Sequence, residues 1–149
     1  MNYEGSVTIP AERGTVWKTV RDPEVLTACV TGAEEIEQVS DREYEGVIRQ
    51  TVAGVSVEMD GNLQIEEWDA PRWLRFTGVG SDTHTGSRME VDADVKITDG
   101  EDGSTLSYDV EVTFTGKLAS LGSRVLRRQI QSNIDAYFDN LADHVSDTQ

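Results

Sequence analysis

Residues 117–145 have the sequence KLASLGSRVLRRQIQSNIDAYFDNLADHV. Apolar residues recur in it at steps of mostly three and four, which places them on one stripe of a helix. Such a helix is about 40 Å long at a rise of about 1.5 Å per residue. An amphipathic helix buries its apolar stripe, so we expect this one to cover a sheet formed by the preceding strands. The stripe comprises Leu118, Leu121, Val125, Leu126, Ile130, Ile134, Tyr137, Phe138, Leu141 and Val145.

Most of the preceding chain alternates between apolar and polar residues, which is the pattern of half-buried strands. Two short helices follow the first strand, one opened by Pro10 and one by Asp22-Pro23. The glycine-rich residues 78–86 predict a loop. We therefore predict a single α+β domain over residues 1–149, in which a curved antiparallel sheet of six to seven strands wraps around the long C-terminal helix. The strands are expected at 3–9, 36–39, 44–52, 55–65, 73–79, 89–97 and 106–114.

The chain is strongly acidic, with 28 Asp and Glu against 13 Lys and Arg and a net charge of −15. This charge argues against a nucleic-acid partner, whose phosphates would be repelled. The carboxylates recur along the whole chain, which favours a halophilic protein working at very high salt; the alternative is an ordinary acidic cytosolic protein. Because no apolar run could span a membrane, no signal peptide is evident and Cys29 is the single cysteine, we expect a cytoplasmic protein.

Several short segments support a more specific interpretation. Their order and spacing, together with the order of the elements, resemble the CoxG family, whose members are accessory subunits of carbon monoxide dehydrogenase. That family has the helix-grip fold of the START and pollen-allergen-like (SRPBCC) superfamily, and the resemblance covers residues 3–145, although Thr31 stands where the family usually has proline. The segments are Asp22-Pro23-Glu24-Val25-Leu26, Ala28-Cys29-Val30-Thr31-Gly32, Tyr44-Glu45-Gly46, Gly78-Val79-Gly80 and Gly116-Lys117-Leu118-Ala119-Ser120-Leu121-Gly122.

The resemblance implies a non-enzymatic accessory or carrier protein with an apolar cavity between sheet and helix. It also implies an association with a molybdenum hydroxylase of the carbon monoxide dehydrogenase type. The implied ligands are lipophilic, quinones among them, and the family offers no catalytic residues to transfer. Family members that reach membranes do so through a tail beyond the last helix, so we expect no anchor of that kind in a sequence that ends at Gln149.

The residues themselves give little support to an enzyme. His84, His144 and Cys29 lack the spacing of metal ligands or of a catalytic set, so we predict no metal, no cofactor and no catalytic residue. Two other functions remain open on the same fold. One is a cyclase- or aromatase-like enzyme, which would need an inward acid, base or metal set. The other is an assembly partner that uses its surface rather than a cavity.

We predict that the ligand lies between sheet and helix, where the alternation turns apolar residues inward. Gln50 and Ser87 are polar residues on these inward faces, and a few convergent polar groups orient ligands in apolar sites. Two alternatives remain: the polar pair lies in water at the mouth of the barrel, or the apolar set closes into a dry core. The predicted ligand-binding residues are Ile48, Gln50, Val52, Met59, Leu63, Phe76, Ser87, Met89, Val91, Val110, Phe114, Leu121, Val125 and Ile130.

A basic cluster lies at the start of the last helix. It consists of Arg124, Arg127 and Arg128. These arginines can dock an acidic partner, such as the molybdenum hydroxylase complex, or an anionic headgroup. The alternative is that they pair with neighbouring carboxylates.

The acidic composition predicts that folding depends on salt. We expect the melting temperature to be clearly higher above about 2 M potassium chloride than at about 0.1 M, because added salt shortens the Debye length from about 10 Å to about 3 Å or less. Circular dichroism melts at the two concentrations measure the difference. Equal melting temperatures would exclude the halophilic interpretation, because the self-repulsion of so uneven a charge must respond to screening.

Overall fold

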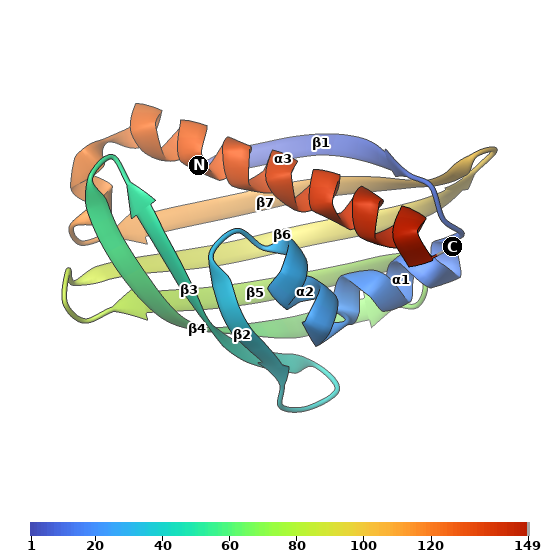
Figure 1. Cartoon of the computed structure of the whole chain (residues 1–149), viewed down its shortest axis with the longest axis horizontal. Coiled ribbons are helices and arrows are strands. Elements are labelled where there is room, and N and C mark those ends of the chain that lie inside the picture. Colours follow the sequence, from blue (N-terminus) through green and yellow to red (C-terminus); the bar gives the residue numbers. More distant parts are fainter. Residues whose placement is uncertain (149) are drawn as a thin grey trace.

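Seven antiparallel strands form one curved sheet, and a long C-terminal helix lies across its concave side (Figure 1). The computed structural model describes residues 1–148, with side chains through Ser146. The strand order is β1-β7-β6-β5-β4-β3-β2, so the first strand pairs with the last. This confirms the predicted α+β helix-grip architecture. The elements are β1 (Asn2–Ile9), α1 (Arg13–Arg21), α2 (Pro23–Cys29), β2 (Ala33–Gln38), β3 (Glu43–Val52), β4 (Val55–Asp69), β5 (Trp73–Asp82), β6 (Ser87–Gly100), β7 (Gly103–Thr115), η1 (Leu118–Leu121) and α3 (Ser123–Thr148).

The buried apolar residues form two clusters, one toward each end of α3. The first core cluster joins α1, α2 and the C-terminal half of α3 to the sheet, and the second joins η1 and the start of α3 to the β3–β4 hairpin. The stripe of the last helix is therefore buried at both ends, as the periodicity predicted. The first cluster contains Ile9, Ala11, Val16, Trp17, Val25, Cys29, Tyr44, Ile65, Leu74, Ile97, Leu106, Leu141 and Val145; the second contains Val52, Val57, Met59, Leu118 and Leu126.

The long helix begins after Gly122 rather than at Lys117, as the sequence predicted. Leu118–Leu121 form the short 3-10 helix η1, and the backbone then turns at Gly122, whose φ of +90° strains any residue with a side chain. The interruption shifts the phase of the apolar stripe. Leu126 is 4% exposed, whereas Val125 is 36% exposed, so the predicted inward position of Val125 was wrong.

The starts of the two short helices follow the sequence unequally. α1 begins at Arg13 rather than at Pro10, because the chain first makes a turn in which the Ala11 amide donates to a carbonyl of β1 at 2.8 Å. The start of α2 is as predicted, since the Asp22 carboxylate accepts from the Glu24 amide at 2.9 Å and proline follows as the first helical residue.

A row of glycines bends the sheet where the sequence predicted a loop over residues 78–86. β5 runs through most of that range, and its Gly80 pairs with Gly61 of β4, which in turn pairs with Gly46 of β3. A Cβ atom on Gly61 would lie 2.9 Å from a carbonyl oxygen of β5, and one on Gly46 would lie 2.6 Å from a carbonyl oxygen of β2. Side chains do not fit such approaches, so these glycines serve the close curvature of β2 to β5 rather than a turn.

Candidate ligand site between the sheet and α3

Between the two core clusters, apolar side chains face inward from the sheet and from α3 but are only partly buried. Val91 and Val110 share the inner face of the sheet with the buried Ala93. Ile130 and Ile134 lie one helical turn apart on α3, and within residues 1–146 neither is packed against a cluster. Water therefore reaches the inner surface here, and this region is less closely packed than the two ends. We call it the mid-section; its residues are Ile48, Val91, Val110, Ile130 and Ile134.

The structure distributes the predicted ligand-binding residues over several environments. Four of them, Ile48, Val91, Val110 and Ile130, lie in the mid-section. Leu63 and Phe76 pack against the first core cluster. The second cluster contains or contacts Val52, Met59, Met89, Phe114 and Leu121. Val125 faces away from the interior, and both polar residues are engaged by the protein itself.

Gln50 fastens α3 to the sheet. Its side-chain amide donates to the Thr31 carbonyl at 2.9 Å and accepts from the Asn133 amide of α3 at 3.2 Å. Asn133 in turn accepts from Gln129 at 3.1 Å, one helical turn back. The alternation of β3 identified Gln50, but sequence reasoning missed its two partners on the helix. The available signal was their uncharged amides, which stand on a helix whose other polar positions include Asp135 and Asp139.

Ser87 is fully committed to holding η1 in place, and neither proposed role, at the barrel mouth or against a ligand, matches its contacts. It is 1% exposed, and its hydroxyl accepts from the Leu118 amide at 3.1 Å and from the Thr85 hydroxyl at 2.8 Å. The same corner is braced by Asp82, whose carboxylate accepts amide hydrogens from Glu58 and His84 at 2.8 Å each. These hydrogen bonds lower the pKa of Asp82, with the bond from Glu58 as the main cause. The expectation that Ser87 faces open space was therefore wrong.

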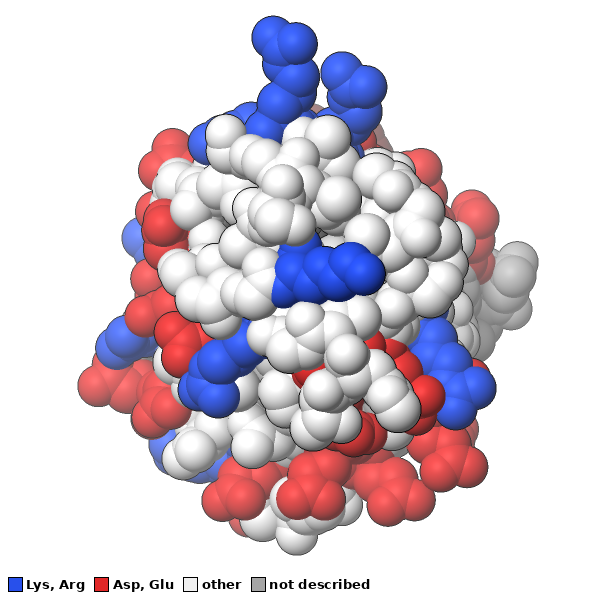
Figure 2. All heavy atoms as spheres, turned by 90° about the vertical axis from the view of Figure 1, so that its left-hand side faces the viewer, with Lys and Arg blue, Asp and Glu red and all other residues white. Residues whose placement is uncertain are grey.

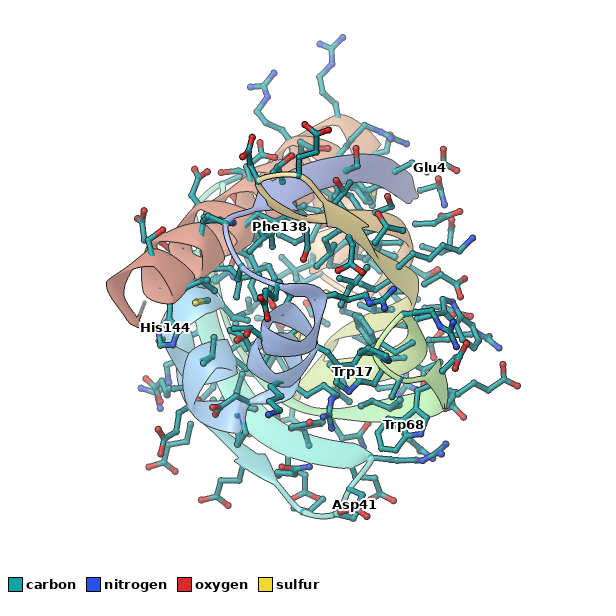
Figure 3. The ribbon with its side chains drawn as sticks, turned by 90° about the vertical axis from the view of Figure 1, so that its right-hand side faces the viewer. Glu4, Trp17, Asp41, Trp68, Phe138 and His144 are labelled. Carbon is teal, nitrogen blue, oxygen red and sulfur yellow. The ribbon has the colours of Figure 1, made fainter. Side chains whose placement is uncertain are left out.

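Aromatic rings continue the inner side of α3 beyond Ile134. The Phe138 ring stacks on Tyr108 of β7 with 5.2 Å between centroids and meets Tyr137 edge-on at 5.1 Å. Figure 3 shows Phe138 on the side of the helix that faces the strands. Cys29 of α2 is 2% exposed, and burial raises the pKa of its thiol, so it is a buried apolar side chain, as predicted. The interior next to the mid-section is thus aromatic.

Two hollows on the outer surface suit an apolar ligand poorly. Their volumes are about 470 and 480 Å³, comparable to small-molecule sites. Both are lined by carboxylates, which water solvates well: Glu12, Asp99 and Glu101 in one, and Glu35, Glu37, Glu45 and Asp60 in the other. No group of three potential metal ligands occurs among the described residues. The interior is therefore the better candidate for a ligand.

The comparison with protein families now identifies the chain. A family model described as CoxG, a carbon monoxide dehydrogenase component, matches residues 5–146. The chain belongs to the CoxG family. This confirms the resemblance carried by the short sequence segments. A search among curated proteins finds no match.

Solved structures show how widely this fold is shared. A conserved protein from Geobacillus kaustophilus is 19% identical, with a TM-score of 0.91 over 99% of this chain and 97% of that one. A START superfamily protein from Mycobacterium smegmatis is 11% identical, with a TM-score of 0.72 over 99% of each chain. Ara h 8.0201 is 16% identical, with a TM-score of 0.67 over 99% of this chain and 98% of that one. At these identities the likeness concerns the fold.

This member of the CoxG family has a basic end on an acidic molecule. Arg124 and Arg128 form no ion pair with a carboxylate within the described part of the chain, so the expected pairing with neighbours was wrong. Arg127 instead donates to the Asn2 carbonyl at 3.4 Å and lies over the Tyr3 ring. Figure 2 shows this end, where uncharged and basic atoms predominate and most carboxylates lie along the margins. None of the described helices has the length and apolar character of a membrane span.

The bond between Gln50 and Asn133 predicts a measurable coupling between β3 and α3. In a double-mutant cycle of Gln50→Ala and Asn133→Ala, we expect a coupling free energy of about 0.5–1.5 kcal/mol from chemical denaturation. Gln131 and Asp135 form a matched pair within α3, bonded at 3.0 Å but exposed, and their cycle should give a smaller value. If both cycles give the same coupling, Gln50 does not fasten the helix.

Proposed function

We propose that this chain binds an aromatic or otherwise apolar small molecule in the mid-section and carries it without transforming it. The observation that carries the proposal is the incomplete burial of inward aliphatic side chains between two well-buried clusters. Family and fold support a lipophilic ligand-binding accessory role in general. An apolar ligand placed there would remove this surface from water at a gain of about 25 cal/mol per Å².

The chemistry around the mid-section favours a binder over an enzyme. The amides of Gln50 and Asn133 already satisfy one another, and the remaining side chains of the region are aliphatic or aromatic. Tyr137 is the titratable group closest along the inner stripe of α3, and a lone phenol is not an acid–base pair. A cyclase- or aromatase-like enzyme on this fold would need more than these residues supply.

We propose a finer role as well: the cargo is a quinone, and the chain serves a molybdenum hydroxylase of the carbon monoxide dehydrogenase type. The description of its family supports the link to that enzyme. Arg124, Arg127 and Arg128 supply a docking surface for an acidic partner, since two of them have no carboxylate partner of their own among the described residues. The same surface would serve an assembly partner that carries no ligand, which is the second candidate function.

Filling the mid-section should abolish binding. We expect native mass spectrometry and titration calorimetry to show one quinone bound to the parent and none to Val91→Trp, because the indole would occupy the ligand's place. Its melting temperature should stay near that of the parent, since open space accepts the ring. In a closely packed interior the same change would cost about 1–3 kcal/mol.

Val79→Trp is the matched control, because Val79 lies on the outer face of β5 between Asn62 and Glu90. It should bind the quinone like the parent. Absence of uptake by the parent, together with a strongly destabilised Val91→Trp, would refute the carrier function and leave the assembly partner.

A further inference from the structure

The phenol of Tyr137 lies deep in the domain at the junction of α3 with α2. It follows Ile134 on the inner stripe of the helix, and the Phe138 ring stands edge-on beside it at 5.1 Å. The helix is fixed to α2 at this level, because Asn140 donates to the Cys29 carbonyl at 3.1 Å. The position of Tyr137 is therefore set by the fold rather than by rotation of a free surface ring.

The hydroxyl of Tyr137 has no hydrogen-bond partner among residues 1–146. The other inward tyrosines near the core differ in this respect: Tyr44 donates to the Arg21 carbonyl at 2.6 Å, and the Tyr3 hydroxyl lies 3.7 Å from the Met1 sulfur. Buried phenols usually find a partner, because an unmatched donor in the interior is costly. The phenol of Tyr137 is thus an unused donor within the described residues.

The unused donor faces enclosed space rather than bulk solvent. Tyr3 and Tyr44 are only 4% and 2% exposed, whereas Tyr137 keeps more accessible surface than either. Burial nevertheless raises the pKa of Tyr137 the most of the three, with the nearby Cys29 as a smaller cause. Accessible surface combined with such strong desolvation describes a group that lines an interior space. The raised pKa also keeps the phenol protonated, and so a donor, at neutral pH.

We propose that Tyr137 donates a hydrogen bond to a carbonyl oxygen of the bound molecule, whose aromatic part lies against Phe138. The ligand class is then a planar aromatic ketone or quinone rather than a plain hydrocarbon. This inference rests on the proposed carrier function and adds the group that orients the ligand. A site with an unused buried donor discriminates against analogues that lack the acceptor.

Two probes with the same carbon skeleton test the role of Tyr137: 2-methyl-1,4-naphthoquinone and 2-methylnaphthalene. We expect Tyr137→Phe to weaken binding of the quinone by about 5- to 15-fold, as one hydrogen bond predicts, and to leave binding of the hydrocarbon unchanged. Tyr108→Phe is the matched control, because Tyr108 belongs to the same aromatic stack and its hydroxyl lies over Gly5 of β1. It should leave the affinity for both probes unchanged.

Infrared spectra give a readout that a purely structural role would not change. The carbonyl band of the bound quinone should lie at lower frequency in the parent than in a hydrocarbon solvent, and should return toward the solvent value in Tyr137→Phe. An unshifted band in the parent, or equal loss of both probes in the variant, would overturn the role of Tyr137 while the carrier function stands. Failure of both probes to bind the parent would instead remove the carrier function itself, and this inference with it.

Discussion

The attachment of α3 along both of its flanks determines how the rest of this domain is built. On one flank, Arg127 reaches the Asn2 carbonyl of β1. On the other, Asn133 bonds Gln50 of β3, and Asn140 bonds the Cys29 carbonyl of α2. Because polar contacts at the flanks and apolar clusters at the ends fix the helix, its inner stripe does not need to touch the sheet along its whole length.

The curvature of the sheet makes this attachment possible. The row of Gly46, Gly61 and Gly80 lets the strands approach closely and bend, which brings β3 within reach of the helix. A loosely packed interior has a cost, about 24 cal/mol per Å³ of empty volume in cores that have been measured. A bound apolar molecule would recover much of that loss, so ligand binding and stability should be linked in this domain.

The distribution of charge complements this architecture. Carboxylates cover the outer face of β2 to β4, where Glu35, Glu37, Glu45 and Asp60 surround one hollow and repel one another. Ion pairs such as Arg75 with Asp92, at 2.8 Å, are partly exposed and contribute little. This crowding gives a structural reason to expect stabilisation by salt. It also makes the basic end at Arg124 and Arg128 the natural surface for an acidic partner.

The sequence predicted the features that depend on local periodicity. Alternation identified the strands and their inward faces, and the apolar stripe identified the last helix. The break at Gly122 was missed, because one glycine within an apolar repeat resembles a tolerated helical glycine. β5 was cut short for a similar reason: Gly78-Val79-Gly80 has the composition of a turn, and only the approach of β4 explains it. The polar contacts of the candidate site could not be predicted in the same way. Amides at Gln129 and Asn133 look solvent-facing on a helical wheel, and the curvature of a distant strand decides that they meet Gln50. The aliphatic positions of the mid-section were predictable, but their incomplete burial was not.

The central claim, that the mid-section contains apolar space, can be tested directly with crystals of the protein pressurised with xenon, because xenon enters dry apolar cavities. Our account predicts xenon density in contact with Val91, Val110 and Ile130, between the sheet and α3. The contradicting result is a mid-section without xenon, in which side chains of the sheet and of α3 touch one another at about 4 Å throughout.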